Sequence, residues 1–193
     1  MMAALTTLYP VILPVSADHQ AQDRRERVKT LSRLAREALS RSCEISKFHL
    51  TTFPKDSDGV PLPVDGIYWS LSHKTEVVGG VAAPAPVGID LETIRPVNEA
   101  LLARVADPQE WSQTDGDPQK SFFRIWTAKE AVLKAVGKGF AGMSRCRVNE
   151  VIDDTRMILT FDNIPWPVLH HWFGDHVAAI TAIDFKIDWQ MMR

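Results

Sequence analysis

The strongest constraint on the fold is a faint internal repeat whose period is close to half the chain length. Residues 78–83, Val-Gly-Gly-Val-Ala-Ala, match residues 177–182, Val-Ala-Ala-Ile-Thr-Ala, in character at an offset of 99 residues in a chain of 193. The same offset superposes the two longest segments of helical periodicity. Two similar αβ halves would produce this pattern, and chance is the alternative, because short runs of small apolar residues are common.

Two segments have the periodicity of amphipathic helices. In residues 23–41, apolar side chains recur at helical spacing and the arginines fall mostly between them, which predicts a helix with a basic outer face. Residues 121–136 give the clearest helical pattern, and Gly137 and Gly139 follow as a stop signal. A shorter helix is expected over residues 98–105.

Strands are predicted between and after these helices. They are indicated by alternation, or by short continuous apolar runs, over residues 68–73, 77–83, 87–92, 148–152, 157–161 and 177–183. A further strand is expected within the first 17 residues. Residues 54–63, rich in Asp, Gly and Pro, are expected to form a loop.

Composition and charge narrow the class of protein. With 45% hydrophobic and 24% charged residues the chain reads as an ordinary globular protein, and no apolar run approaches the roughly 20 residues that cross a bilayer. Residues 24–47 hold eight basic and three acidic side chains, whereas residues 84–118 hold two basic and seven acidic ones. Residues 24–47 could therefore attract phosphate, and residues 84–118 could attract a cation. The alternative is that both regions are ordinary solvated faces. Cys43 and Cys146 show no Cys-x-x-Cys pattern and are expected to be reduced thiols in the cytoplasm.

Two carboxylates lie close together in the segment Val-Gly-Ile-Asp-Leu-Glu, residues 87–92. In a strand, Asp90 and Glu92 point to one face and their apolar neighbours point to the other. Like charges at this spacing repel unless a cation lies between them, and hard oxygen ligands suit Mg²⁺ bound to a diphosphate, with Gly88 letting the ligand approach. The alternative is a solvated strand end, which is the commoner meaning of an isolated Asp-x-Glu.

The helix of residues 121–136 contains the segment Trp-Thr-Ala-Lys-Glu-Ala-Val-Leu-Lys, residues 126–134. Glu130 and Lys134 lie one turn apart on the same face, next to Lys129. Glu130 is a candidate to complete a metal site or to accept the proton of an attacking hydroxyl, and Lys134 is a candidate to neutralise a phosphate. As an isolated feature, the pair is a surface ion pair worth about 0.2–0.5 kcal/mol.

Ser72 and His73 end the strand expected over residues 68–73, and both side chains can donate hydrogen bonds to phosphate oxygens. A structural histidine is the alternative for His73. The sequence contains no Walker loop, no Gly-x-Gly-x-x-Gly turn, no Gly-x-Ser-x-Gly elbow and no nucleic-acid-binding module. The candidate site combines acidic Mg²⁺ ligands with separate phosphate ligands and has no Gly-rich loop. This combination is not typical of the common nucleotide-binding enzymes.

Taken together, these residues resemble the 4′-phosphopantetheinyl transferases of the surfactin-synthetase-activating type and the related bacterial enzymes that act on acyl carrier proteins. Three motifs carry the resemblance: the Ser-His pair within residues 69–73, the Asp-x-Glu segment of residues 87–92, and the helical segment of residues 126–134. The third motif, downstream of the second, is the specific one. The resemblance extends over about residues 24–139.

The resemblance implies an α+β fold with a pseudo-twofold arrangement of two similar αβ halves. These would be about residues 1–95 and 96–193 of a single unit spanning residues 1–193, with coenzyme A bound in the cleft between them. It implies transfer of the 4′-phosphopantetheine moiety of coenzyme A to a serine of an apo acyl or peptidyl carrier protein, with Mg²⁺ as cofactor and 3′,5′-ADP as product. The alternative, of a different class, is a non-catalytic coenzyme A or carrier-protein binding module of the same fold.

The resemblance also implies the partners, which are carrier proteins of fatty acid, polyketide or nonribosomal peptide biosynthesis. The cysteine pattern predicts a cytoplasmic location, and the lack of a long apolar run and of a nucleic-acid-binding module predicts that neither a membrane nor nucleic acid is a partner. A monomer is expected, because a chain with two halves can form its cleft alone.

The resemblance implies roles for the site residues as well. Asp90 and Glu92 would be metal ligands, and Glu130 would be a third ligand or the base that activates the carrier serine. Lys134, with Lys129, would stabilise charge on the diphosphate as it breaks.

The implied contacts to the phosphates of coenzyme A come from Ser72 and His73 and, for the 3′-phosphate, from Arg24 or Arg25. The chain departs from the family at one position, because the family often has Gly-Lys-Pro before the Ser-His strand where residues 59–61 here are Gly-Val-Pro. Lys55, in the same loop, is the candidate to replace the missing lysine, and a lower affinity for coenzyme A is the alternative.

Overall fold

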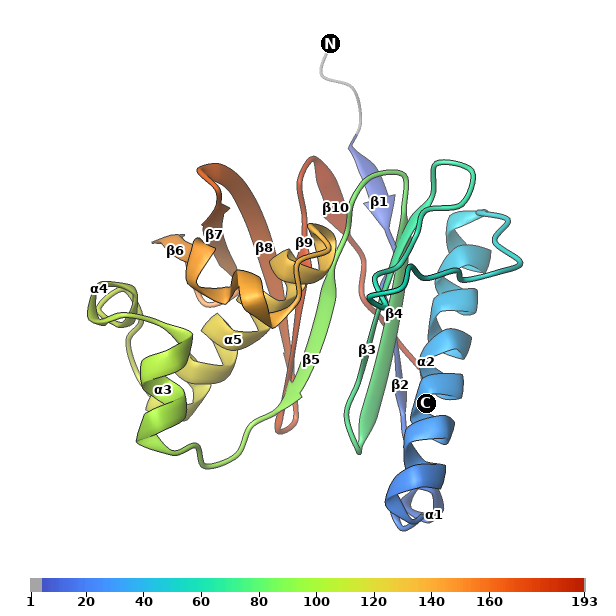
Figure 1. Cartoon of the computed structure of the whole chain (residues 1–193), viewed down its shortest axis with the longest axis horizontal. Helices are drawn as coiled ribbons and strands as arrows, with labels where there is room; N and C mark the ends of the chain where they lie inside the picture. The colour runs from blue at the N-terminus through green and yellow to red at the C-terminus, as the bar shows by residue number, and fades with distance from the viewer. Residues whose placement is uncertain (1–4, 193) are drawn as a thin grey trace.

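The computed structural model describes residues 5–192, which form four layers (Figure 1). Two sheets face each other in the middle, and one long helix covers the outer face of each sheet. This arrangement confirms the α+β class and the two similar halves that the sequence predicts, because the repeated strands and the repeated helices occupy matching places in the two halves.

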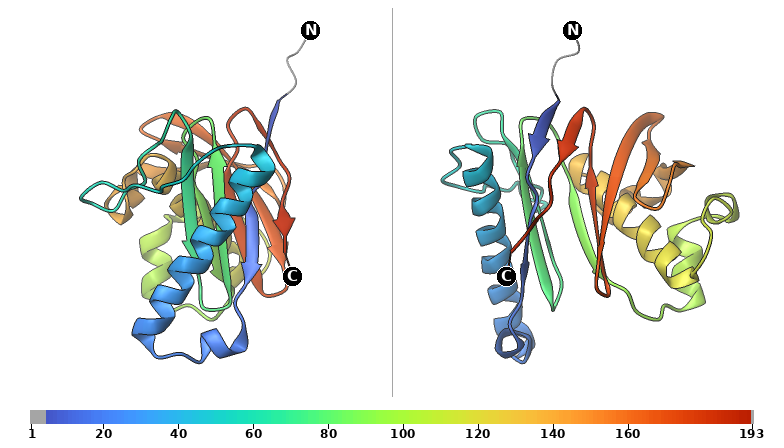
Figure 2. Two further views of the ribbon diagram at one scale, coloured as in Figure 1. Left: turned by 90° about the vertical axis from the view of Figure 1, so that its right-hand side faces the viewer. Right: turned by 180° about the vertical axis from the view of Figure 1, so that it is seen from behind.

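The N-terminal sheet has the strand order β11-β2-β4-β3, formed by β11 (Gln190–Met191), β2 (Val11–Pro14), β4 (Val77–Ala83) and β3 (Tyr68–His73). The C-terminal sheet has the order β5-β9-β8-β7-β6, formed by β5 (Ile89–Thr93), β9 (His176–Thr181), β8 (Ile164–Phe173), β7 (Arg156–Phe161) and β6 (Cys146–Val151). A short parallel pair joins the halves at one end, formed by β1 (Thr6–Leu8) and β10 (Phe185–Ile187), which run side by side when the molecule is seen from behind (Figure 2).

Helix α2 (Arg24–Ser46) covers the N-terminal sheet. It begins after Asp23, whose carboxylate accepts hydrogen bonds from two backbone N–H groups of the first turn, and it ends at Lys47, which has a left-handed backbone with φ of 59°. The helix approaches β4 closely because Gly80 has no side chain. A Cβ at Gly80 would lie 2.6 Å from the backbone nitrogen of Leu39.

Helix α5 (Pro118–Ala135) covers the C-terminal sheet and is capped by the carboxylate of Asp117. Its apolar face, which includes Phe122, Ile125 and Val132, packs in the largest hydrophobic core of the protein. The shorter helices are α1 (Ala17–Gln20), α3 (Glu99–Val105), α4 (Pro108–Trp111) and the 3₁₀ helix η1 (Phe140–Arg145).

A separate apolar core lies between the two sheets. Val81 of β4 packs there with Ile89 of β5 and Ile180 of β9, and Ile12 of β2 packs with Leu91 of β5. Because Ile89 and Leu91 face this core, the alternation of β5 turns Asp90 and Glu92 to the opposite face, towards α5.

Two strands pair with partners on the other side of residues 95 and 96, where the halves are expected to divide. Strand β5 precedes that division but pairs with β9, and β11 follows it but pairs with β2. Each half therefore receives one strand from the other part of the chain.

Strand β8 is absent from the strands predicted from the sequence, and it contains Pro165 and Pro167, which are uncommon inside a sheet. The carbonyl of Pro167 accepts a hydrogen bond from the N–H of Ala182, which follows β9. In a strand the nitrogen of a residue faces the same side as its carbonyl, so the nitrogens of Pro167 and Pro165 also face the β9 side. Strand β9 pairs with β8 only from Val168 onward, so no ladder hydrogen bond from either proline is needed there. The missing N–H groups are thus tolerated in an inner strand. Among residues 5–192, none of the helices has the length and apolar composition to span a membrane.

Candidate active site

The candidate site lies where the two sheets meet. Strands β3 and β5 are the facing edge strands, and the hydroxyls of Ser70 and Ser72 on β3 accept hydrogen bonds from the backbone N–H groups of Ile89 and Leu91 on β5, each at 3.1 Å. Edge N–H groups otherwise have no partner in the sheet. Two serine side chains therefore join the halves and fix β5 beside β3.

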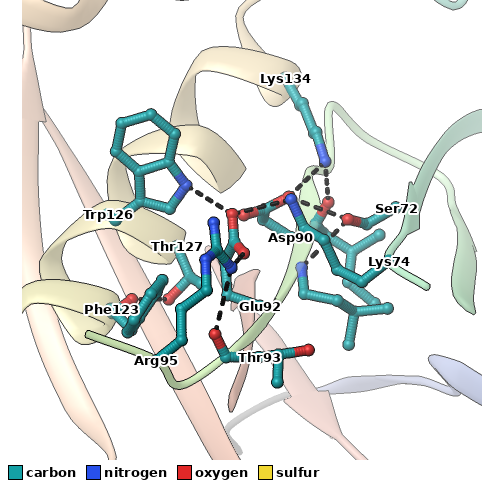
Figure 3. A network of polar contacts seen from close by, with 12 residues as sticks. Ser72, Lys74, Asp90, Glu92, Thr93, Arg95, Phe123, Trp126, Thr127 and Lys134 are labelled. Carbon is teal, nitrogen blue, oxygen red and sulfur yellow. Dashed lines mark hydrogen bonds and ion pairs between the residues drawn. The ribbon is translucent and has the colours of Figure 1, made fainter. Parts of the chain in front are cut away.

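Asp90 is the central carboxylate of this seam and is only 4% exposed. Its Oδ1 accepts hydrogen bonds from Ser72 Oγ at 2.9 Å and from Lys134 Nζ at 2.7 Å (Figure 3). Its Oδ2 is buried and has no hydrogen-bond partner. One oxygen of a buried charge is thus held by the protein and the other is left for a ligand.

Lys134 reaches from α5 to both strands. Its Nζ donates to Asp90 Oδ1 and also to the carbonyls of Ile89 at 2.9 Å and Leu71 at 3.2 Å. The spacing of the helix suggested an ion pair with Glu130, but Lys134 pairs with Asp90, because the seam brings this strand within reach of the helix. Its ammonium therefore stabilises the carboxylate and also connects the two halves.

Glu92, the second carboxylate of the strand, is 3% exposed and is surrounded by donors. Its Oε1 accepts from Lys74 Nζ at 2.7 Å and from the indole Nε1 of Trp126 at 2.9 Å, and its Oε2 lies 3.4 Å from the guanidinium of Arg95 (Figure 3). From the sequence, Trp126 was given no contact beyond its place in the motif of residues 126–134, and Lys74 was missed. The signal for Trp126 was present, since it precedes Glu130 by one turn on the same face.

Glu130 lies in a cavity of about 340 Å³ that is lined by residues of both halves: Leu71, Ser72, His73, Lys74, Asp90, Trp126, Glu130 and Lys134. Burial, and then the negative charge of Asp90, raises the pKa of Glu130 above its ordinary value. A carboxylate with a raised pKa in a cleft suits a group that accepts a proton from a substrate.

The expected phosphate ligands are only partly brought together. Ser72 lies in the cavity, but its hydroxyl is already bonded to Asp90 and to β5. His73 lies at the rim, where desolvation and then the positive charges of Lys134 and Lys74 lower its pKa. Arg24 lines an adjoining basic pocket that also contains His73 and Lys74, whereas Arg25 does not line it.

Lys129 does not lie in the cleft, contrary to its expected role beside Lys134. It is 2% exposed, and its Nζ lies 2.6 Å from Glu110 Oε1 and donates to the carbonyl of Val105 at 2.7 Å. One residue along a helix turns the side chain by about 100°, so Lys129 points towards α3 and α4 while Glu130 points into the cavity. Its role is to anchor these helices to α5.

Gly88 also has a different role from the expected one of admitting a ligand. A Cβ at this position would lie 1.8 Å from the carbonyl oxygen of Ala131 in α5. The glycine is therefore required for the close approach of α5 to the start of β5, and this approach brings Glu130 and Lys134 to the carboxylates.

The donor set fits a magnesium ion only in part as it stands. Asp90 has an unpartnered oxygen and shares its cavity with Glu130, whereas both oxygens of Glu92 are occupied by donors. Within residues 5–192, no three His, Cys, Asp or Glu side chains lie close enough together to hold a metal ion by themselves. Mg²⁺ is commonly held by one or two carboxylates, with substrate phosphates and water completing the shell, so Asp90 and Glu130 are the residues that would hold it here.

The fold and the site thus define a class: two-halved α+β proteins with a buried carboxylate and lysine cluster at the seam between the halves. Residues 86–181, about half of the chain, match the family described as the 4′-phosphopantetheinyl transferase superfamily. The chain belongs to this superfamily.

Three relatives illustrate the similarity. The chain is 37% identical over 143 residues to 4′-phosphopantetheinyl transferase HetI of Nostoc sp., covering 68% of this chain and 60% of the relative. It is 33% identical over 95 residues to 4′-phosphopantetheinyl transferase psf-1 of Bacillus pumilus, covering 46% and 41%, and 28% identical over 114 residues to 4′-phosphopantetheinyl transferase Sfp of Bacillus subtilis, covering 56% and 50%. The matched region therefore spans 60% or less of the length of each of these relatives.

Proposed function

We propose that the chain is an enzyme that transfers the 4′-phosphopantetheine moiety of coenzyme A to a serine hydroxyl of an apo acyl or peptidyl carrier protein. Membership of the superfamily and the names of the relatives support this activity. The observation that carries the proposal is the site itself: Asp90, with one oxygen unpartnered, shares a cavity with Glu130 and Lys134 at the seam between the halves.

In this reaction the serine oxygen forms a bond to the phosphorus nearer the pantetheine, and the bond from that phosphorus to the bridging oxygen breaks, releasing 3′,5′-ADP. Glu130 is the group that takes the serine proton, because its pKa is raised and it lies in the cavity. Mg²⁺, when bound, supplies positive charge that offsets the charge developing on the leaving phosphate.

The remaining residues hold and orient the reacting groups. Asp90 and one oxygen of Glu130 are the proposed metal ligands, which leaves the other oxygen of Glu130 to take the serine proton. Glu92 is a further ligand once its donors release it. Ser72 and Lys134 fix the Asp90 carboxylate in one orientation. Lys134 is 29% exposed and lines the cavity, so it can also face a diphosphate there.

His73 and Arg24 are the proposed contacts to the outer phosphates of coenzyme A, since both line the basic pocket that adjoins the cavity. Carrier proteins of fatty acid, polyketide or nonribosomal peptide assembly are the proposed acceptors. We propose a cytoplasmic monomer, which is supported by the free, buried thiols of Cys43 and Cys146 and by a cavity formed within one chain.

The test is a transfer assay with purified chain, coenzyme A, Mg²⁺ and a panel of apo carrier proteins, read by mass spectrometry of the intact carrier. The expected result is a mass gain equal to one phosphopantetheine on at least one carrier, lost when its acceptor serine is changed to alanine. If coenzyme A binds but no carrier of the panel is modified, the chain is a binding module of the same fold.

A further inference from the structure

Lys74 is a basic side chain placed between two binding regions of the site. It ends close to Glu92, with Nζ 2.7 Å from Oε1, and it lines both the cavity with the carboxylates and the adjoining basic pocket of Arg24, Arg27 and Arg95. Its side chain is 32% exposed, whereas that of Glu92 is 4% exposed. The lysine can therefore turn towards either region, but Glu92 cannot follow it.

The charges of the cavity are balanced without any ligand. Asp90 and Glu130 line the cavity together with the cations of Lys134 and Lys74. Glu92 lies behind Lys74, where it pairs with Lys74 and Arg95. A divalent cation entering alone would add two positive charges to this balanced group and would meet Lys74 at one of its ligands. Two cations at close range in a partly buried site repel strongly.

A diphosphate changes this balance because it supplies the negative charge that the divalent cation lacks. It also gives Lys74 a second acceptor within the cavity, which Lys74 already lines, so that Glu92 can be released. The metal and the diphosphate should then each bind more tightly in the presence of the other, and linkage requires the two effects to be equal.

We propose that Lys74 is a built-in counter-cation of Glu92 that makes the binding of a divalent cation and of a diphosphate-bearing ligand interdependent. The proposal rests on the proposed function, because it concerns the same site. Lys74 is a positioning residue in this scheme: it holds Glu92 away from the metal until the diphosphate arrives, and it then turns to the diphosphate.

The test measures binding of Mn²⁺ alone, followed by the electron paramagnetic resonance signal of free Mn²⁺, with and without coenzyme A. Lys74→Gln removes the charge but retains a donor for Glu92, so the buried carboxylate keeps a partner and the variant should fold. We expect it to bind Mn²⁺ alone at least about tenfold more tightly than the wild type and to gain less from coenzyme A. Lys74→Arg retains the charge and should behave like the wild type, as should Lys120→Gln, which removes an exposed lysine at the start of α5.

The proposal would be overturned if Lys74→Gln bound Mn²⁺ alone with an affinity within about twofold of the wild type. It would also be overturned if Lys74→Arg lost as much of the coenzyme A-dependent gain in Mn²⁺ affinity as Lys74→Gln does. These outcomes are separate from the proposed function. Phosphopantetheine transfer is read on the carrier protein, and its absence in the wild type would refute the activity without altering the comparison of Mn²⁺ affinities.

Discussion

Replacing Lys129 with methionine separates a structural lysine from a ligand-binding one. The substitution keeps most of the apolar stem but leaves the Glu110 carboxylate, 4% exposed, without its cation. Removing one partner of a buried ion pair costs about 3–5 kcal/mol, because an uncompensated charge stays in the interior. Since a whole domain is stabilised by about 5–15 kcal/mol, Lys129→Met should shift the urea midpoint of unfolding strongly downward.

The second variant adds Glu110→Gln to Lys129→Met, which removes the orphaned charge and should restore most of the lost free energy of unfolding. The assay is urea unfolding followed by tryptophan fluorescence, together with calorimetric titration of coenzyme A at a temperature where each variant is folded. Coenzyme A affinity should stay within about twofold of the wild type, because Lys129 points away from the cavity. An unchanged unfolding midpoint combined with a large loss of coenzyme A affinity would refute the structural role.

Further predictions for three variants concern the proposed base, the seam and the packing of α5. Glu130→Gln should lower the transfer rate at least about a hundredfold, and in the wild type the rate should rise with pH as Glu130 loses its proton, both measured on an intact carrier protein. The pKa of Glu130 is raised in the folded state, so the stability that the wild type owes to the protonated form is present at low pH and is lost as the pH rises through the folded pKa. Glu130→Gln should therefore be more stable than the wild type at high pH. The same pH dependence of the urea midpoint in both proteins would contradict this. Ser70→Ala leaves the buried N–H of Ile89 without an acceptor and should cost about 1–3 kcal/mol in urea unfolding, whereas a change within about 0.5 kcal/mol would mean that the serine does not join the sheets. Gly88→Ala would place a methyl group against the carbonyl of Ala131 and should cost about 3 kcal/mol or prevent folding, so a thermal midpoint equal to that of the wild type would exclude the close packing of α5 on β5.

The local parts of the site could be predicted from the sequence because they depend on the period of one element. The alternation of a strand places Asp90 and Glu92 on one face, and the helical period places Trp126, Glu130 and Lys134 on another. Strands β3 and β4 have the predicted bounds, whereas α2 extends to Ser46, five residues beyond its predicted end, and α5 begins at Pro118, three residues before its predicted start.

The contacts between elements could not be predicted from these periods. Lys134 pairs with Asp90 because β5 belongs to the C-terminal sheet, where it pairs with β9 beneath α5. The sequence pattern of β5 alone does not indicate which sheet the strand joins. The use of Ser70 as a backbone acceptor and the burial of Lys129 against Glu110 likewise depend on which elements become neighbours. The motifs therefore identified the residues of the site, but the contacts of Lys134, Ser70 and Lys129 became clear only from the structure.

The central claim is that Asp90 and Glu130, brought together at the seam, hold a divalent cation on the diphosphate of coenzyme A. Its most direct test is an anomalous difference map from crystals of this chain grown with coenzyme A and Mn²⁺. We expect one Mn²⁺ peak bonded to Asp90 Oδ2, to a Glu130 oxygen and to the diphosphate. A diphosphate bound elsewhere on the protein, or a Mn²⁺ peak with neither carboxylate as a ligand, would contradict the claim.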